Sequence, residues 1–190
     1  MNIVIFGPPG AGKGTQSKFI EDKYNLYQLS TGDLLRNEIK NKTSLGNKIT
    51  SIMNSGELVS DEIVSNLIEK FISNKDYKDK IIFDGYPRTI SQAKNLDILL
   101  NKYDQKINIV LKLSVSLETV KKRILARQSE EKRADDNEQV AIKRFKTYEE
   151  ASKNVIDYYN QSNLLKVING ETSITEINTE ISGIIDAIKG

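Results

Sequence analysis

Short apolar runs alternate along the chain with longer stretches in which apolar residues recur every three or four positions. Five runs have the length of a buried β-strand, at residues 3–6, 26–29, 80–83, 107–113 and 165–168. The stretches with helical spacing lie at residues 16–24, 89–101, 116–128, 136–160 and 173–188. Because strands that alternate with helices form parallel sheets with right-handed crossovers, the pattern predicts an α/β fold with helices on both faces.

The connection between the second and third predicted strands is longer than one crossover requires. It holds about 50 residues, with helical spacing at residues 32–41, 44–54 and 61–74. We interpret this excess as an inserted substrate-binding arm. The polar run at 128–136 is the segment that we expect to form a mobile loop. Since the 190 residues show no composition shift and no internal repeat, we expect a single domain.

Composition narrows the possible chemistry. The 28 basic residues nearly balance the 26 acidic ones, so nothing favours nucleic acid or a membrane as the main partner. No apolar stretch reaches the roughly 18 residues of a membrane span, and we expect a cytoplasmic protein. The absence of histidine and cysteine excludes disulfides, imidazole bases and thiolate or imidazole metal sites. Catalysis must therefore depend on positioning, charge and a hard cation bound by oxygen.

The stretch GPPGAGKGT at residues 7–15 directly follows the first apolar run. A glycine-rich turn between a buried strand and a helix directs backbone amides into one concavity, which binds anions. Gly7 to Lys13 fit the phosphate-loop pattern G-x-x-x-x-G-K, with Lys13 placed to reach the terminal phosphates of a nucleotide. The alternative is a tight turn that contains a lysine by chance. The usual Ser or Thr after the lysine is Gly14 here and Thr15 follows, so a magnesium contact from this loop would have to come from Thr15.

Asp84 ends the third predicted strand and precedes a glycine. Because strand ends in parallel sheets open on the ligand crevice, we expect Asp84 to hold Mg²⁺ through its waters. The alternative is an aspartate that only forms a turn.

Arginine is used sparingly, since 22 of the 28 basic residues are lysine and six are arginine. A guanidinium forms two parallel hydrogen bonds to a phosphate, which a lysine ammonium cannot do, so each arginine is a candidate phosphate ligand. The alternative is surface ion pairing, for example of Arg123 and Arg127 with Glu118 or Glu130.

Four motifs in order along the chain resemble the adenylate kinase family. They are GPPGAGKGTQ at 7–16, STGDLLR at 30–36, DGYPRT at 84–89 with Gln92, and RADD at 133–136 followed by KRF at 143–145. Four ordered motifs are more specific than a phosphate loop alone. The resemblance implies reversible transfer of a phosphoryl group from MgATP to AMP, giving two ADP.

The resemblance also implies a fold and its division. The fold would be a P-loop three-layer sandwich with a five-stranded parallel sheet in the order 2-3-1-4-5. The core would comprise residues 1–29, 60–127 and 136–190, with an AMP-binding arm at 30–59 and a short lid loop at 128–135. The short loop leaves no room for the zinc-bearing lid of longer relatives, and we expect a monomer without zinc.

Site residues follow from matching positions in the family. The implied ATP site is Gly10, Ala11, Gly12, Lys13, Gly14, Thr15, Arg123, Arg127 and Thr172. The implied AMP site is Thr31, Arg36, Glu57, Val59, Gly85, Arg88, Gln92, Arg133 and Arg144. The implied catalytic set is Lys13, Asp84, Arg88, Arg123, Arg127, Arg133 and Arg144, while Asp135 and Asp136 resemble the acidic pair that ties the lid to the core. Gln92 would read the adenine edge, and Arg36 and Arg88 would clamp the AMP phosphate. Thr31 has a second possible role, because Thr before a helix often caps it.

Two other functions stay open at this point. A UMP/CMP kinase shares the frame, although such enzymes typically have alanine at Thr31 and asparagine at Thr89. A nucleotide-binding scaffold without activity is the second alternative, although such a protein should have lost part of the charge cluster. A regulatory GTPase would need a guanine-reading N-K-x-D segment after a strand, whereas Asn101 to Asp104 follows a predicted helix and is interpreted as a turn.

Overall fold

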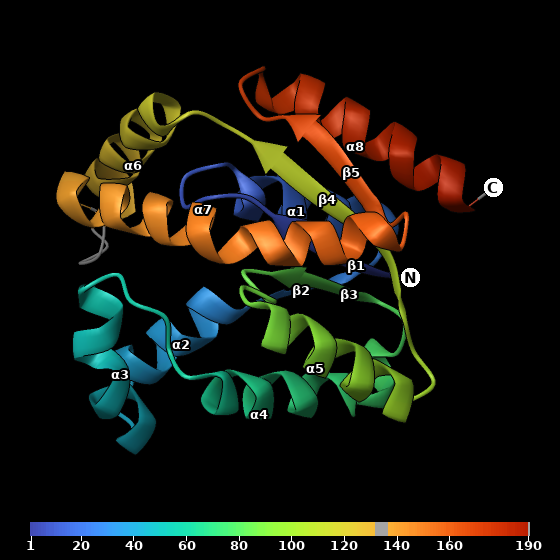
Figure 1. Cartoon of the computed structure of the whole chain (residues 1–190), viewed down its shortest axis with the longest axis horizontal. Helices are drawn as coiled ribbons and strands as arrows, with labels where there is room; N and C mark the ends of the chain where they lie inside the picture. Colours follow the sequence, from blue (N-terminus) through green and yellow to red (C-terminus); the bar gives the residue numbers. More distant parts are fainter. Residues whose placement is uncertain (132–136, 190) are drawn as a thin grey trace.

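The fold is a five-stranded parallel sheet between layers of helices. The computed structural model describes residues 1–131 and 137–189. The strands of the described residues are β1 (Asn2–Phe6), β2 (Tyr27–Ser30), β3 (Ile81–Asp84), β4 (Ile107–Ser114) and β5 (Leu165–Asn169). They are all parallel and lie in the order β2-β3-β1-β4-β5, which confirms the expected P-loop fold (Figure 1).

The helices follow the predicted alternation. Those of the core are α1 (Lys13–Tyr24), α4 (Asp61–Ile72), α5 (Ile90–Lys102), α6 (Leu117–Glu131), α7 (Glu138–Gln161) and α8 (Ile174–Lys189). The long connection between β2 and β3 contains, besides α4, the helices α2 (Thr31–Lys40) and α3 (Ser44–Asn54) and a 3-10 turn, η1 (Lys75–Tyr77). α1 begins three residues before the expected start, because Lys13 to Thr15 carry no apolar residue that periodicity could detect. α6 continues to Glu131, so the first part of the expected lid loop is helical, and residues 132–136 lie outside the described residues.

Alternation along β1 divides the core between the two faces of the sheet. Ile3 and Ile5 pack with apolar residues of α1 and α8, whereas Val4 and Phe6 pack with residues of α4, α5 and α7. All four side chains are at most 5% exposed, as expected for a central parallel strand covered on both faces.

The carboxyl ends of the strands meet along one edge of the sheet. Ile5 pairs with Asp84, and Ser30 pairs with Asp84 from the other side. β1 neighbours β3 on one side and β4 on the other, so the chain leaves β1 at the topological switch point where ligands bind in such sheets. Figure 1 shows α6 on one side of this edge and α2 and α3 on the other.

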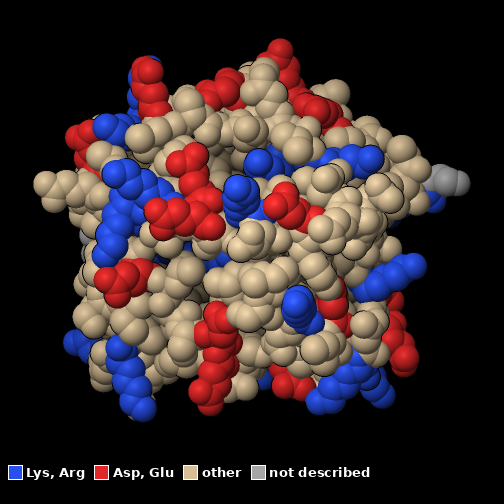
Figure 2. Space-filling model, viewed as in Figure 1, with Lys and Arg blue, Asp and Glu red and all other residues tan. Residues whose placement is uncertain are grey.

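Surface charge gives no strong field on the visible face. Figure 2 shows acidic and basic side chains interspersed over that face, in agreement with a net charge of +2. Within the described part of the chain, no helix is both long enough and apolar enough to cross a bilayer.

Candidate active site

The phosphate loop lies between β1 and α1 and is shaped by its glycines. Gly10 and Gly12 have φ angles of 79° and 94°, a region that L side chains rarely adopt. Gly12 is the residue before α1, and no side chain caps this helix start. Two other helices of the site, α2 and α5, are instead capped by Ser30 and Thr89. The first amides of α1 are therefore not taken by a capping side chain and are available to an anion.

Lys13 lies folded over this loop. Its Nζ donates to the carbonyl oxygens of Gly7 at 2.8 Å and Pro8 at 3.0 Å. Burial, together with the guanidinium groups of Arg88 and Arg144, lowers the pKa of Lys13 to about 8, and the charge of Asp84 opposes the shift. A poorly solvated cation close to other cations is strongly stabilised when a phosphate anion binds beside it.

Asp84 stands at the end of β3, facing the start of α1. Only 7% of the residue is exposed, and its Oδ2 accepts a hydrogen bond of 2.9 Å from Nε2 of Gln28. The same oxygen lies 4.0 Å from the point where Gly14 would carry a Cβ, and any larger residue at this position would approach the carboxylate. A buried carboxylate beside the phosphate loop fits a Mg²⁺ that keeps its waters. Thr15 is exposed on α1. Among the described residues, no group of three or more Asp and Glu side chains could hold a metal by itself.

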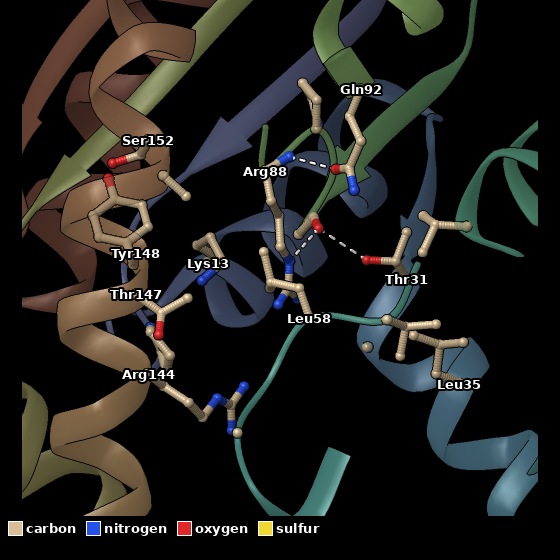
Figure 3. Close-up of a pocket in the computed structure, with 18 of the residues that line it drawn as sticks. Lys13, Thr31, Leu35, Leu58, Arg88, Gln92, Arg144, Thr147, Tyr148 and Ser152 are labelled. Carbon is tan, nitrogen blue, oxygen red and sulfur yellow. Dashed lines mark hydrogen bonds between the residues drawn. The ribbon is translucent and has the colours of Figure 1, made fainter. Parts of the chain in front are cut away.

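Arg88 lies between Lys13 and Thr31 in the view of Figure 3. The carbonyl oxygen of Gly85 accepts from Nε of Arg88 at 2.7 Å and from the hydroxyl of Thr31 at 3.0 Å. Gly85 has a φ of 77°, and a Cβ there would lie 3.0 Å from the Thr31 hydroxyl. Burial, with the charge of Arg144, lowers the pKa of Arg88 to about 10, so the guanidinium still carries its charge at neutral pH.

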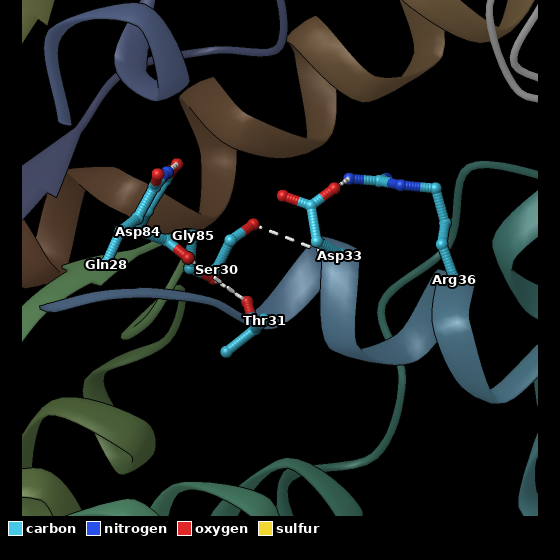
Figure 4. A network of polar contacts seen from close by, with 7 residues as sticks. All are labelled: Gln28, Ser30, Thr31, Asp33, Arg36, Asp84 and Gly85. Carbon is cyan, nitrogen blue, oxygen red and sulfur yellow. Dashed lines mark hydrogen bonds and ion pairs between the residues drawn. The ribbon is translucent and has the colours of Figure 1, made fainter. Parts of the chain in front are cut away.

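Ser30, and not Thr31, caps the start of α2. Ser30 accepts from the amide of Asp33 at 3.3 Å, while Thr31 is the first residue of α2 and directs its hydroxyl to Gly85 (Figure 4). Arg36, one turn further along α2, pairs with Asp33 at 2.6 Å. A negative charge in the first turn of α2 is favourable at the positive end of the helix dipole.

Lys13, Thr31, Arg36, Gly85 and Arg88 line a cavity of about 1080 Å³, a volume that includes space open to solvent. Gly10, Gly12 and Asp84 are not among its lining residues. The cavity is lined by the phosphate loop, by α2, by the segment between α3 and α4, and by one face of α7. Of the implied AMP site, the lining residues are Thr31, Arg36, Glu57, Val59, Gly85, Arg88, Gln92 and Arg144. Val59 is buried, and the carboxylate of Glu57 pairs with Lys143 of α7 at 3.1 Å. Arg133, like Asp135 and Asp136, lies outside the described residues.

Two arginines of the implied ATP site, Arg123 and Arg127, lie near the phosphate loop. Arg123 of α6 donates to the carbonyl oxygens of Ala11 at 3.2 Å and Gly170 at 2.8 Å. It does not pair with Glu118, which binds Lys122 at 2.8 Å. Arg127 acts on the pKa of Lys13 and therefore lies in the same electrostatic environment. Thr172 follows Gly170 in the segment between β5 and α8, and its hydroxyl donates to the carbonyl of Asn169.

Several lining residues were not predicted. Thr147, Tyr148, Ala151 and Ser152 of α7 continue the row that begins at Arg144. Spacings of three and four residues from a predicted site residue on a helix were the signal that could have found them. Gln28, which holds Asp84, was also missed, because no local pattern links it to a residue 56 positions away.

The segment that resembled a guanine-reading motif is a turn, as interpreted. Asn101 and Lys102 end α5, and Asp104 follows with a φ of 53°, its amide donating to the carbonyl of Asn101. The segment from Asn101 to Asp104 therefore follows a helix and not a strand.

Comparison with known proteins identifies the family. A sequence model described as adenylate kinase matches residues 5–164. The adenylate kinase of Pelagibacter ubique is 41% identical over 211 aligned positions, which cover 97% of this chain and 99% of the relative. The adenylate kinase of Azobacteroides pseudotrichonymphae is 44% identical over 190 positions, covering 98% and 97%. The alignment with the Pelagibacter protein exceeds the 190 residues of this chain, so that relative has residues which this chain lacks.

A third relative, the adenylate kinase of Fusobacterium nucleatum, is 39% identical and covers 97% of the chain and 98% of its own length. These names favour neither the pyrimidine kinase nor the inactive scaffold. The matched family model and the near-full-length relatives show that the chain belongs to the adenylate kinase family, enzymes that transfer a phosphoryl group between ATP and AMP.

Proposed function

We propose that this chain converts ATP and AMP to two ADP in the cavity between the phosphate loop and α2, α5 and α7. The observation that carries the proposal is the convergence of Lys13, Arg88 and Arg144 with the Asp84 carboxylate. Arg88 and Arg144 lower the pKa of Lys13, and Arg144 lowers the pKa of Arg88, so the three cations lie within electrostatic reach of one another. Like charges gathered in a half-buried cavity are costly unless an anion joins them.

The donor nucleotide would lie on the phosphate loop. The amides at the start of α1 would bind the phosphate tail, and Lys13 would leave the carbonyls of Gly7 and Pro8 to bind the terminal phosphates. Arg123, already placed against Ala11 and Gly170, would flank the phosphates and the base from α6.

The acceptor nucleotide would lie on the opposite wall. Arg88 and Arg36 would hold the AMP phosphate, and Gln92, with the apolar surface of Val59, would hold the base. Arg144 would lie between the two nucleotides, where charge spreads over the transferring group. Because phosphoryl transfer requires mainly alignment and neutralisation of charge, the absence of histidine is no obstacle.

Magnesium would be held by Asp84 through water, and when bound it would neutralise charge on the ATP phosphates. Gln28 would keep the carboxylate of Asp84 turned toward the phosphate loop through its 2.9 Å hydrogen bond.

Closure of residues 30–59 over AMP would exclude water from the reaction. We propose that the lid predicted at 128–135, whose first residues belong to α6, would cover ATP in the same way. The Glu57–Lys143 ion pair is a contact that joins the arm to α7. That the enzyme is a monomer in the cytoplasm stays a prediction, and sedimentation at micromolar concentration tests the first part.

A bisubstrate mimic with two adenosines linked by five phosphates tests the two-site arrangement. Calorimetry should give one mimic per chain, and a mixture of ATP and AMP should give two nucleotides per chain. Production of ADP from the same mixture distinguishes an enzyme from a scaffold. Binding of only one nucleotide at saturation would contradict the proposal.

A further inference from the structure

Gln92 lines the acceptor side of the cavity, yet its amide is held by two protein groups. Its Oε1 accepts from the backbone amide of Arg88 at 2.7 Å, and its Nε2 donates to Oδ1 of Asp61 at 2.6 Å. Gln92 is 3% exposed, so neither amide atom exchanges these partners freely with water. Asp61 is the first residue of α4 and does not line the cavity.

The carboxylate of Asp61 is itself held in place by the first turn of α5. Its Oδ2 accepts from the hydroxyl of Ser91 and from the hydroxyl of Thr89. Thr89 caps α5, and its hydroxyl oxygen accepts from the backbone N–H of Gln92. One carboxylate oxygen is therefore fixed by hydroxyl donors, while the other faces the Gln92 amide.

These partners permit only one orientation of the amide. A carboxylate accepts hydrogen bonds and a backbone N–H donates them, so Nε2 must face Asp61 and Oε1 must face Arg88. Rotation of the amide by half a turn would set oxygen against carboxylate and NH₂ against N–H. Each amide atom retains one further hydrogen-bonding position, namely one hydrogen on Nε2 and one lone pair on Oε1.

The orientation matters because purines present opposite patterns on the edge that an amide can read. Adenine donates from its 6-amino group and accepts at N1, whereas guanine accepts at O6 and donates from N1. For a base in a given position, an amide that matches one purine must be turned over to match the other.

We propose that Asp61 is a specificity-determining positioning residue, which holds the Gln92 amide in the orientation that matches adenine and opposes the orientation that matches guanine. The inference rests on the proposed role of Gln92 as reader of the acceptor base. It concerns a residue that does not line the cavity and would act only through Gln92.

A purely structural role for Asp61 is the competing explanation. α4 and α5 are also linked by Ser65 with Asn95 at 2.7 Å and by Glu69 with Lys102 at 2.8 Å, so in the described part of the chain Asp61 is the first of three α4 residues with polar contacts to α5. The chain thus offers two matched controls. Ser65→Ala removes the next link, and Glu62→Gln removes the other acidic charge from the first turn of α4.

The experiment compares AMP and GMP as acceptors, with ATP as donor, for wild type, Asp61→Asn, Gln92→Leu and the two controls. The readout is the ratio of kcat/KM for AMP to that for GMP, measured on one preparation, so the fraction of folded protein cancels. Because an asparagine can donate to the turned amide, Asp61→Asn should lower the ratio about tenfold, chiefly through a higher KM for AMP. Gln92→Leu should lower it at least as much, and the controls should leave it unchanged.

Each outcome decides something. An unchanged ratio in Asp61→Asn beside a lowered ratio in Gln92→Leu would overturn the inference and leave the proposed role of Gln92 intact. Unchanged ratios in both variants would overturn the role of Gln92 as well. An equal fall in Asp61→Asn and Ser65→Ala would show that Asp61 only joins the two helices.

Discussion

The two walls of the cavity are built by different means. The phosphate loop is one continuous stretch in which main-chain groups, set by the φ angles of Gly10 and Gly12, would bind the ligand. The opposite wall, where the acceptor nucleotide would bind, is called the acceptor wall, and the phosphate loop is called the donor wall. The acceptor wall consists of side chains from α2, from the β3–α5 connection and from α7, which are far apart in the sequence. A main-chain site tolerates change of side chains but not of backbone geometry. A side-chain site depends on the positions of several elements at once, and on residues such as Asp61 that fix its members.

The largest effect should come from the donor wall. Lys13→Ala should lower kcat about a thousandfold, because the variant loses the one side-chain cation of the loop. Its free energy of unfolding at pH 7 should not fall, since burial of Lys13 disfavours its charge. Steady-state kinetics and thermal unfolding measure the two quantities. Lys18→Ala is the matched control, because Lys18 is exposed on the same helix and pairs with Glu21. Substantial activity in Lys13→Ala would contradict its assignment.

The acceptor wall should respond to shape as well as to charge. Arg88→Lys keeps the charge but loses the 2.7 Å bond to Gly85 and the two-pronged grip. We expect kcat/KM for AMP to fall about a hundredfold, as for a misplaced substrate, with the KM for ATP nearly unchanged. Equal losses for both nucleotides would show that Arg88 does not distinguish the two walls.

One glycine in each wall permits a direct comparison. Gly10→Ala and Gly85→Ala both place a methyl group at a positive φ, where Cβ would lie 3.1 Å from Ile124 Cγ1 and 3.0 Å from Thr31 Oγ1, respectively. Each change should weaken binding about tenfold, for ATP in the first variant and for AMP in the second. Gly183→Ala, in α8 with open space around it, should change neither affinity. Calorimetry measures the affinity for each nucleotide separately. Weaker AMP binding in Gly10→Ala, or weaker ATP binding in Gly85→Ala, would refute the division into two walls.

The smallest expected effect is a dependence on pH at the donor wall. Because the pKa of Lys13 is lowered to about 8, the cation is fully present below this pH and is lost above it. ATP affinity should fall about fourfold between pH 7 and 8.5 in wild type and stay level in Lys13→Met. The folded-state pKa lies below the ordinary value of 10.5, so the unfolded chain binds more protons between about 8 and 10.5. The free energy of unfolding should therefore rise through this window in wild type relative to Lys13→Met.

The sequence by itself determined the parts of this protein that depend on local pattern. Strand and helix periodicity predicted the parallel sheet, glycine spacing predicted the phosphate loop, and four ordered motifs indicated the family. These features are local because a strand buries alternate or all residues, a helix buries every third or fourth, and a loop glycine is needed where its own φ is positive.

Only the tertiary structure decided which side chains meet. It gave the helix cap to Ser30 and directed the Thr31 hydroxyl to Gly85, placed Gln28 against Asp84, and set Asp61 against Gln92. It also brought the α7 row beyond Arg144 into the cavity. Such contacts depend on how strands align at the sheet edge and how helices pack against each other, and pairs separated by 31 to 56 residues leave no trace in a local pattern.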